Sequence, residues 1–197
     1  INFSLKFFND SEEMKYRSIN IDEVNLLTKS DLVAMGQTAL LDAIGKTLMY
    51  LINKKIKNNS CYNKCIVYVA TDGLENCSKI YNKENIKQMI NQAKLCCIEV
   101  LYLGANQDAI LEASTFGIDC NNAINYNETA ENISNVYRSL ASAAMRQRTG
   151  VDISFTQAER TMSVLPDTNT LISTPPPTPP SQLLSSPPRI RRNNTPI

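Results

Sequence analysis

The chain has 197 residues, of which 43% are hydrophobic and 20% are charged, and its formal net charge is +1. This length and apolar fraction allow one domain with a buried core plus an appendage. The nearly neutral charge excludes the basic footprint of a nucleic-acid-binding domain or of a protein held on an anionic membrane surface.

The absence of targeting signals and the way cysteines are used favour a cytoplasmic protein. No apolar run reaches the roughly 20 residues that a membrane-spanning helix needs, and the first residues do not follow the pattern of a signal peptide. Six cysteines without any histidine favour reduced, mostly buried thiols, with a structural zinc site at the Cys61-x3-Cys65 and Cys96-Cys97 pairs as the alternative. Because the sequence begins with Ile1, we expect it to start inside a longer product.

The amino-terminal part predicts a β-hairpin. Apolar and polar residues alternate over residues 1–8 and again over residues 14–21, as is typical of half-buried strands. Asn9-Asp10-Ser11 between them is a turn signal. Residues 22–37 are expected to form a loop or a short helical turn.

A helix and an apolar strand follow. Residues 39–56 carry apolar side chains at helical spacing and predict an amphipathic helix, with Gly36 and Thr38 at its start. After a turn, the run Ile-Val-Tyr-Val-Ala at 66–70 has no polar alternation. This pattern suits a strand that is covered on both faces in a parallel sheet.

The end of that strand carries the first candidate for chemistry. Thr71, Asp72 and Gly73 stop the apolar run abruptly. Open α/β sheets bind their ligands at the carboxyl ends of the strands, and glycine allows a close approach of the backbone. A turn aspartate and a helix-capping threonine are the structural explanations of Asp72 and Thr38 taken singly.

The second half of the chain alternates helices with strands, which predicts an α/β fold with a largely parallel sheet. Gly117 and Gly150 follow two of the helices and are placed to end them. The last helix is expected to turn Ile133, Val136, Tyr137, Leu140, Ala144 and Met145 inward. The predicted elements are helix 83–95, strand 98–103, helix 108–116, strand 123–126 and helix 130–148.

Periodicity fades after the last helix. Residues 1–150 are therefore assigned to the domain and residues 151–165 to a connecting segment. Residues 166–197 include the run TPPPTPP at 174–180, which favours extended polyproline geometry and no packed core. We expect a disordered tail, either idle, docked on a PxxP-binding domain or phosphorylated at Ser/Thr-Pro sites.

Two segments together resemble the von Willebrand factor A-like (vWA) domain. They are GQTALLDAIGKTL at 36–48 and VYVATDGLENCS at 67–78. The family's metal-ion-dependent adhesion site (MIDAS) uses a threonine before a helix and an aspartate in a strand-terminal Thr-Asp-Gly, so the resemblance implies that Thr38 and Asp72 are metal ligands. LYLGANQDA at 101–109 and VYRSLASAAMRQR at 136–148 are similar to the later part of viral and bacteriophage members.

The resemblance implies a three-layer Rossmann-like fold and a metal-dependent protein-binding module without catalysis. Carboxylate and hydroxyl oxygens suit Mg²⁺ or Mn²⁺. In the family a carboxylate of the partner protein often completes the metal shell. Gly73, Glu75 and Asn76 would lie at the rim, where Glu75 and Asn76 could equally be surface residues without contacts and Gly73 a turn residue. A viral origin would place the protein in the host cytoplasm or the virion.

One departure from the family affects the site. The Asp-x-Ser-x-Ser motif that follows the family's first strand is absent ahead of Gly36. Asp152-Ile-Ser-Phe-Thr is the nearest internal match to the motif, but it follows no buried strand, so we regard it as coincidental. The missing strand, motif and helix are expected upstream of Ile1, with the strand between residues 1–8 and 65–70. Without them, metal binding should be weak and two strand edges unpaired.

Two other functions are compatible with the sequence. An α/β enzyme could bind a phosphorylated ligand at the same edge, with Asp72 for Mg²⁺ and the turn at 104–106 for phosphate, although no Gly-rich phosphate-binding motif is present. A purely structural interaction domain without metal is the third hypothesis. No activated nucleophile or histidine base supports catalysis.

Overall fold

A computed structural model of the chain describes residues 1–28, 30–31, 36–58, 64–105 and 108–166. One compact unit runs from Ile1 to Leu165, and the second, Pro166–Ile197, lies almost entirely outside the described residues. The expectations for the proline-rich tail, for Cys61 and for Asn106 of the 104–106 turn therefore fall outside them as well.

The amino-terminal hairpin is confirmed. Strand β1 (Asn2–Phe8) pairs with strand β2 (Glu12–Asn20) in antiparallel orientation, with Phe8 opposite Glu12. The Asn9 side chain closes the turn, because its Oδ1 accepts from the N–H and the hydroxyl of Ser11 at 2.7 and 2.8 Å. A short 3₁₀ helix, η1 (Ile21–Glu23), follows β2.

Three parallel strands form a separate sheet in the order β3-β4-β5, which confirms the α/β class. They are β3 (Cys65–Thr71), β4 (Ile98–Ala105) and β5 (Ala123–Tyr126). Strand β4 is central and almost completely buried, as suits a sequence that is apolar apart from the partly buried Glu99. Successive side chains of β4 point to opposite faces of the sheet, so the strand contributes to two cores.

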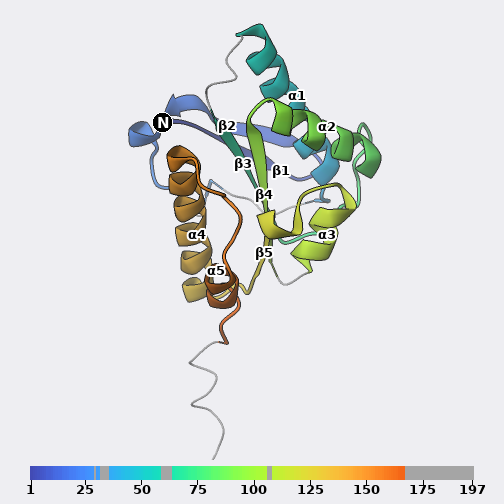
Figure 1. Cartoon of the computed structure of the whole chain (residues 1–197). Coiled ribbons are helices and arrows are strands. Elements are labelled where there is room, and N and C mark those ends of the chain that lie inside the picture. Colours follow the sequence, from blue (N-terminus) through green and yellow to red (C-terminus); the bar gives the residue numbers. More distant parts are fainter. Residues whose placement is uncertain (29, 32–35, 59–63, 106–107, 167–197) are drawn as a thin grey trace, which may run out of the picture. The chain divides into compact units, whose positions relative to one another are not determined.

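Three helices cover one face of this sheet (Figure 1). They are α1 (Leu40–Lys57), α2 (Lys83–Leu95) and α3 (Ala109–Thr115), each within two residues of its predicted range. The main core lies between them and the sheet, and Phe8 of the hairpin packs against it. Its largest fully buried side chains include Leu40, Leu48, Ile86, Ile90, Ile98, Tyr102 and Phe116.

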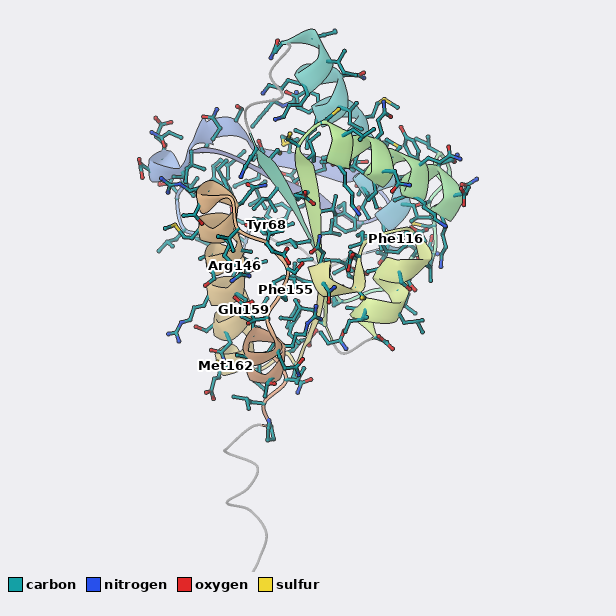
Figure 2. All side chains as sticks on the ribbon, viewed as in Figure 1. Tyr68, Phe116, Arg146, Phe155, Glu159 and Met162 are labelled. Carbon is teal, nitrogen blue, oxygen red and sulfur yellow. The ribbon has the colours of Figure 1, made fainter. Side chains whose placement is uncertain are left out.

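The opposite face is covered by α4 (Ala130–Thr149) and α5 (Gln157–Met162), with η2 (Cys120–Asn122) leading into β5 (Figure 1). A second core forms here from Leu101, Leu103, Ile124, Val136, Ala143, Ile153 and Phe155. The segment after Gly150, for which the sequence predicts no structure, thus supplies two core residues and a helix. Arg146 of α4 and Glu159 of α5 pair at 2.9 Å and fix this segment (Figure 2).

The predicted inner face of α4 is partly wrong. Ile133, Tyr137 and Met145 are 37%, 66% and 57% exposed, whereas the polar residues Asn132 and Asn135 are buried. Their amides donate to backbone carbonyls of the returning chain, Asn132 to Leu165 and Asn135 to Met162, each at 2.9 Å. A polar side chain can be buried when it is hydrogen-bonded, so the helix turns its asparagines inward.

Strand β3 is not covered on both faces as its apolar sequence predicts. Tyr68 is 39% exposed and Ala70 is exposed, so the face that β3 shares with the second core is left partly uncovered at this strand. Tyr68 lies beside α4 (Figure 2), and its hydroxyl donates to the carbonyl of Leu140 at 3.2 Å. None of the helices within the described residues is long and apolar enough to cross a membrane.

Candidate functional site

The start of α1 and the end of β3 meet at the carboxyl edge of the parallel sheet. A Cβ added to Gly73 would lie 2.7 Å from Thr38 Oγ1, so the threonine hydroxyl touches the backbone next to Asp72. The structure therefore brings together the two segments that the sequence singles out, although they are more than thirty residues apart in the chain.

Thr71 shapes the turn that presents Asp72. Its hydroxyl accepts from the N–H of Gly73 at 3.1 Å and lies 2.8 Å from the carbonyl of the same residue. This tight turn leaves Asp72 exposed at the edge. Burial raises the pKa of Tyr126, at the end of β5, and the charge of Asp72 is one of the neighbouring charges that raise it further. Asp72 directly follows β3, and its charge also acts on Tyr126 at the end of β5.

Asn76 binds the backbone of Thr38 on both sides. The Thr38 N–H donates to Asn76 Oδ1 at 2.8 Å, and the Asn76 N–H donates to the Thr38 carbonyl at 3.1 Å. Asn76 is therefore not a surface residue without contacts. Both backbone groups of the candidate metal ligand are used by a single residue of the β3–α2 loop.

Glu75 caps helix α1 from outside. One carboxylate oxygen accepts from the Leu41 N–H at 2.8 Å and the Ser78 hydroxyl at 2.7 Å. The other accepts from the N–H groups of Cys77 and Ser78 at 3.0 and 2.7 Å. These four bonds occupy the acceptor capacity of the carboxylate, so Glu75 is not available as a direct metal ligand.

The hydrogen bonds also determine the charge state of Glu75. Burial by itself would raise its pKa, but the donors from Leu41, Ser78 and Cys77 outweigh burial and hold the pKa below its ordinary value of 4.5. Ala39, at the N-cap position of α1, has no side-chain oxygen that could accept from the first N–H groups of the helix, so Glu75 accepts from Leu41 instead. A carboxylate at a helix amino terminus is also favoured by the helix dipole.

Asp42 is a structural residue of the site that the sequence pattern misses. It falls off the apolar stripe of α1 and would be assigned to solvent, yet it is only 7% exposed. Its carboxylate accepts from the N–H groups of three consecutive loop residues, Lys79, Ile80 and Tyr81, at 2.9 to 3.0 Å. These bonds outweigh burial and lower its pKa. The one signal in the sequence is an acidic residue in the first helical turn.

The hairpin reaches the same edge. The Ala39 N–H donates to the carbonyl of Asn9 at 2.8 Å, directly after β1. Asp10, which the sequence suggests only as a turn residue, lies so near Gly36 that a Cβ there would be 3.2 Å from its Oδ1. Gly36 has a φ of +82°, which favours glycine at this position. The ends of β1 and β3 thus both meet the start of α1.

The oxygen donors at this edge suit a hard cation in type but not in number. Thr38 offers a hydroxyl and Asp72 an exposed carboxylate, which are ligands that Mg²⁺ and Mn²⁺ accept. Octahedral coordination needs about six oxygens, and most would have to come from water or from another segment. Among the described residues, no group of three acidic, cysteine or histidine side chains converges to hold a metal ion.

The Asp152 segment lies away from this edge. Asp152 Oδ1 accepts from the N–H and hydroxyl of Ser154 at 3.0 and 2.8 Å. With Cys97 and Glu99, at the amino end of β4, it lines a cavity of about 570 Å³. Residues 152–156 therefore lie at the opposite end of the sheet from Thr38.

Comparison of the sequence with protein-family models gives no match, and comparison with curated proteins gives no significant one. The functional argument therefore rests on the residues of this edge.

Proposed function

We propose that the chain contains a vWA-like domain of the viral and bacteriophage type, which acts as a metal-ion-dependent protein-binding module without catalysis. The observation that carries this proposal is the close approach of Thr38 Oγ1 to Gly73, where an added Cβ would lie 2.7 Å from it. It supports a shared site for the threonine that precedes α1 and the aspartate that follows β3. A purely local role for either residue would not require the two segments to meet.

In this proposal Thr38 and Asp72 bind Mg²⁺ or Mn²⁺ directly or through water. A carboxylate from a partner protein completes the shell, and the metal ion bridges the two chains. Asp72 is exposed, as a ligand that faces a partner must be. Hard cations keep several waters and exchange them for carboxylate oxygens, so a partner can join without rearrangement of the protein ligands.

The proposed domain has one more strand, which carries the Asp-x-Ser-x-Ser motif between β1 and β3. Two features support this position. Both strands end at the start of α1, through Asn9 and Gly73, yet they belong to separate sheets within the described residues. Within the described residues β3 pairs only with β4, so its other edge has no strand partner. The additional serines would supply the missing oxygen ligands.

Paramagnetic NMR tests the metal site even when binding is weak. Substoichiometric Mn²⁺ is added to the ¹⁵N-labelled full chain, and signal loss is followed residue by residue. We expect selective broadening of the amides around Thr38 and Gly73, which Asp72→Asn abolishes. Asp152→Asn is the matched control at the opposite end of the sheet and should change nothing at this edge.

Broadening that is unchanged in the Asp72→Asn variant, or that is uniform over all acidic surface residues, would contradict the metal site. It would favour the hypothesis of an interaction domain that binds no metal. A phosphoester hydrolysis screen addresses the enzyme hypothesis separately. Hydrolysis that is lost when Asp72 is replaced would favour the enzyme hypothesis over the binding module.

A further inference from the structure

The start of α1 has no means of fixing Thr38 by itself. Ala39, at the N-cap position, makes no side-chain cap, and Thr38 precedes the first helical residue. The first N–H groups of a helix have no partner within the helix and must find one elsewhere. The place of the Thr38 hydroxyl is therefore set by what binds this turn from outside.

Most of those partners come from one short stretch of the β3–α2 loop. The N–H of Thr38 goes to Asn76, that of Leu41 to Glu75 and that of Asp42 to Ser78, at 2.8, 2.8 and 3.0 Å. Ala39 is bound by the carbonyl of Asn9. The same loop begins with Asp72 and Gly73, so it carries one candidate ligand and holds the other.

We propose that Asn76 is a positioning residue for the metal site, with Glu75 supporting it. This inference rests on the proposed function, because it assigns Asn76 a task toward the Thr38 ligand. Two bonds from Asn76 hold the backbone of Thr38 in the place from which its Oγ1 approaches Gly73. Residues that orient metal ligands commonly cost 10- to 100-fold in metal affinity when they are replaced.

The side chain of Asn76 itself binds no metal in this arrangement. Its Oδ1 is engaged by the Thr38 N–H. Glu75 likewise uses both oxygens on the loop and on α1. A loss of metal affinity on replacing Asn76 would therefore be an effect on the position of Thr38 and not the loss of a ligand.

The experiment compares Asn76→Ala with Asn135→Ala, which also removes one side-chain bond to a distant backbone group but on α4, at Met162. The metal-free measurement is the nuclear Overhauser effect between the Thr38 side chain and the Gly73 amide. The second measurement is Mn²⁺ affinity from the broadening titration, well below the unfolding temperature. We expect Asn76→Ala to lose the Overhauser contact and about tenfold in affinity, whereas Asn135→Ala keeps both.

Further variants keep the inference falsifiable. Asn76→Asp retains the acceptor oxygen and should retain the Overhauser contact. If Asn76→Ala does not fold, Ser78→Ala removes the acceptor of the Asp42 N–H and one donor to Glu75, and it should weaken affinity in the same direction by a smaller factor. A variant Asn76→Ala that melts earlier but keeps contact and affinity would reduce Asn76 to a stabilising residue.

The two proposals fail in different ways. Absence of Mn²⁺ binding at this edge in the unaltered chain would remove the proposed function. The Overhauser measurement needs no metal, so it would still decide whether Asn76 holds Thr38 in place.

Discussion

Gly73 shows how closely two distant segments are fitted at the candidate site. Its φ is not among the positive values of the chain, so glycine is not needed here for its backbone conformation. Its role is steric, because the Thr38 hydroxyl occupies the space of a side chain. At Gly150, by contrast, nothing comes nearer to an added Cβ than Lys64 Nζ at 4.0 Å.

We predict that Gly73→Ala destabilises the chain by about 1–3 kcal/mol, the usual range for inserting a carbon atom into a packed site. The clash is with Thr38 Oγ1, so in a Thr38→Ala background the same change should cost much less. Urea unfolding of the four proteins of this double-mutant cycle measures the coupling. Purely additive effects would mean that the two residues do not meet in solution.

At the residue scale the sequence could identify Thr38, Asp72 and Gly73, because each stands at a local boundary of a helix or a strand. It could not predict the bond between Glu75 and Leu41, since nothing local pairs residues so far apart. The family resemblance implies only a rim position for Asn76, and its bonds to Thr38 cannot be predicted locally either. Tertiary hydrogen bonds of loop side chains depend on the completed fold.

Helix α1 is an element whose amino terminus depends on ionised carboxylates. Glu75 and Asp42 both have a pKa below the ordinary value, 4.5 and 3.8 respectively, and both accept backbone N–H groups that connect α1 with the loop before α2. A carboxylate with a lowered pKa stabilises the folded state above its ordinary pKa. The contribution is lost as the pH falls through the folded-state value.

We predict that the free energy of unfolding falls as the pH drops below about 4.5, and that Glu75→Gln makes this fall shallower. Near neutral pH the variant should itself be less stable by about 1–3 kcal/mol, because an ionised acceptor of several N–H groups is replaced. Urea unfolding at a series of pH values measures both effects. Glu159 also has a lowered pKa, so Glu159→Gln shows how much of the slope comes from another helix. Parallel pH profiles of Glu75→Gln and the unaltered chain would contradict the assignment.

The helices also show where periodicity succeeds and fails as a predictor. The boundaries of α2 agree with the predicted range at both ends, and its buried residues Ile86, Met89, Ile90 and Ala93 recur at helical spacing. The buried face of α4 does not agree, because Asn132 and Asn135 find partners in residues 162–165. Periodicity records hydrophobicity alone, whereas burial also depends on available hydrogen-bond partners.

For the whole molecule, the main exposed feature of the sheet is the outer side of β3. Within the described residues β3 pairs with β4 alone, and the strand carries no charged residue. Uncovered apolar edge strands pair readily with other chains, and natural proteins commonly protect them with lysine.

We predict that Ala70→Lys raises the concentration at which the chain begins to self-associate, without loss of the folded state. Static light scattering against concentration measures the onset, and circular dichroism checks the fold. Tyr137→Lys on the exposed side of α4 is the control, since it adds the same charge away from the strand edge. Equal effects of both variants would show that charge in general, and not the edge, limits association.

The two faces of the sheet are covered by segments that lie at different positions along the sequence. Every residue of the core under α1, α2 and α3 lies between Phe8 and Ala123. The core under α4 is complete only with Ile153 and Phe155. During synthesis, all residues of the first core therefore leave the ribosome while Leu101, Leu103 and Ile124 still face water, and these three side chains are covered only after residues 153–155 have been made.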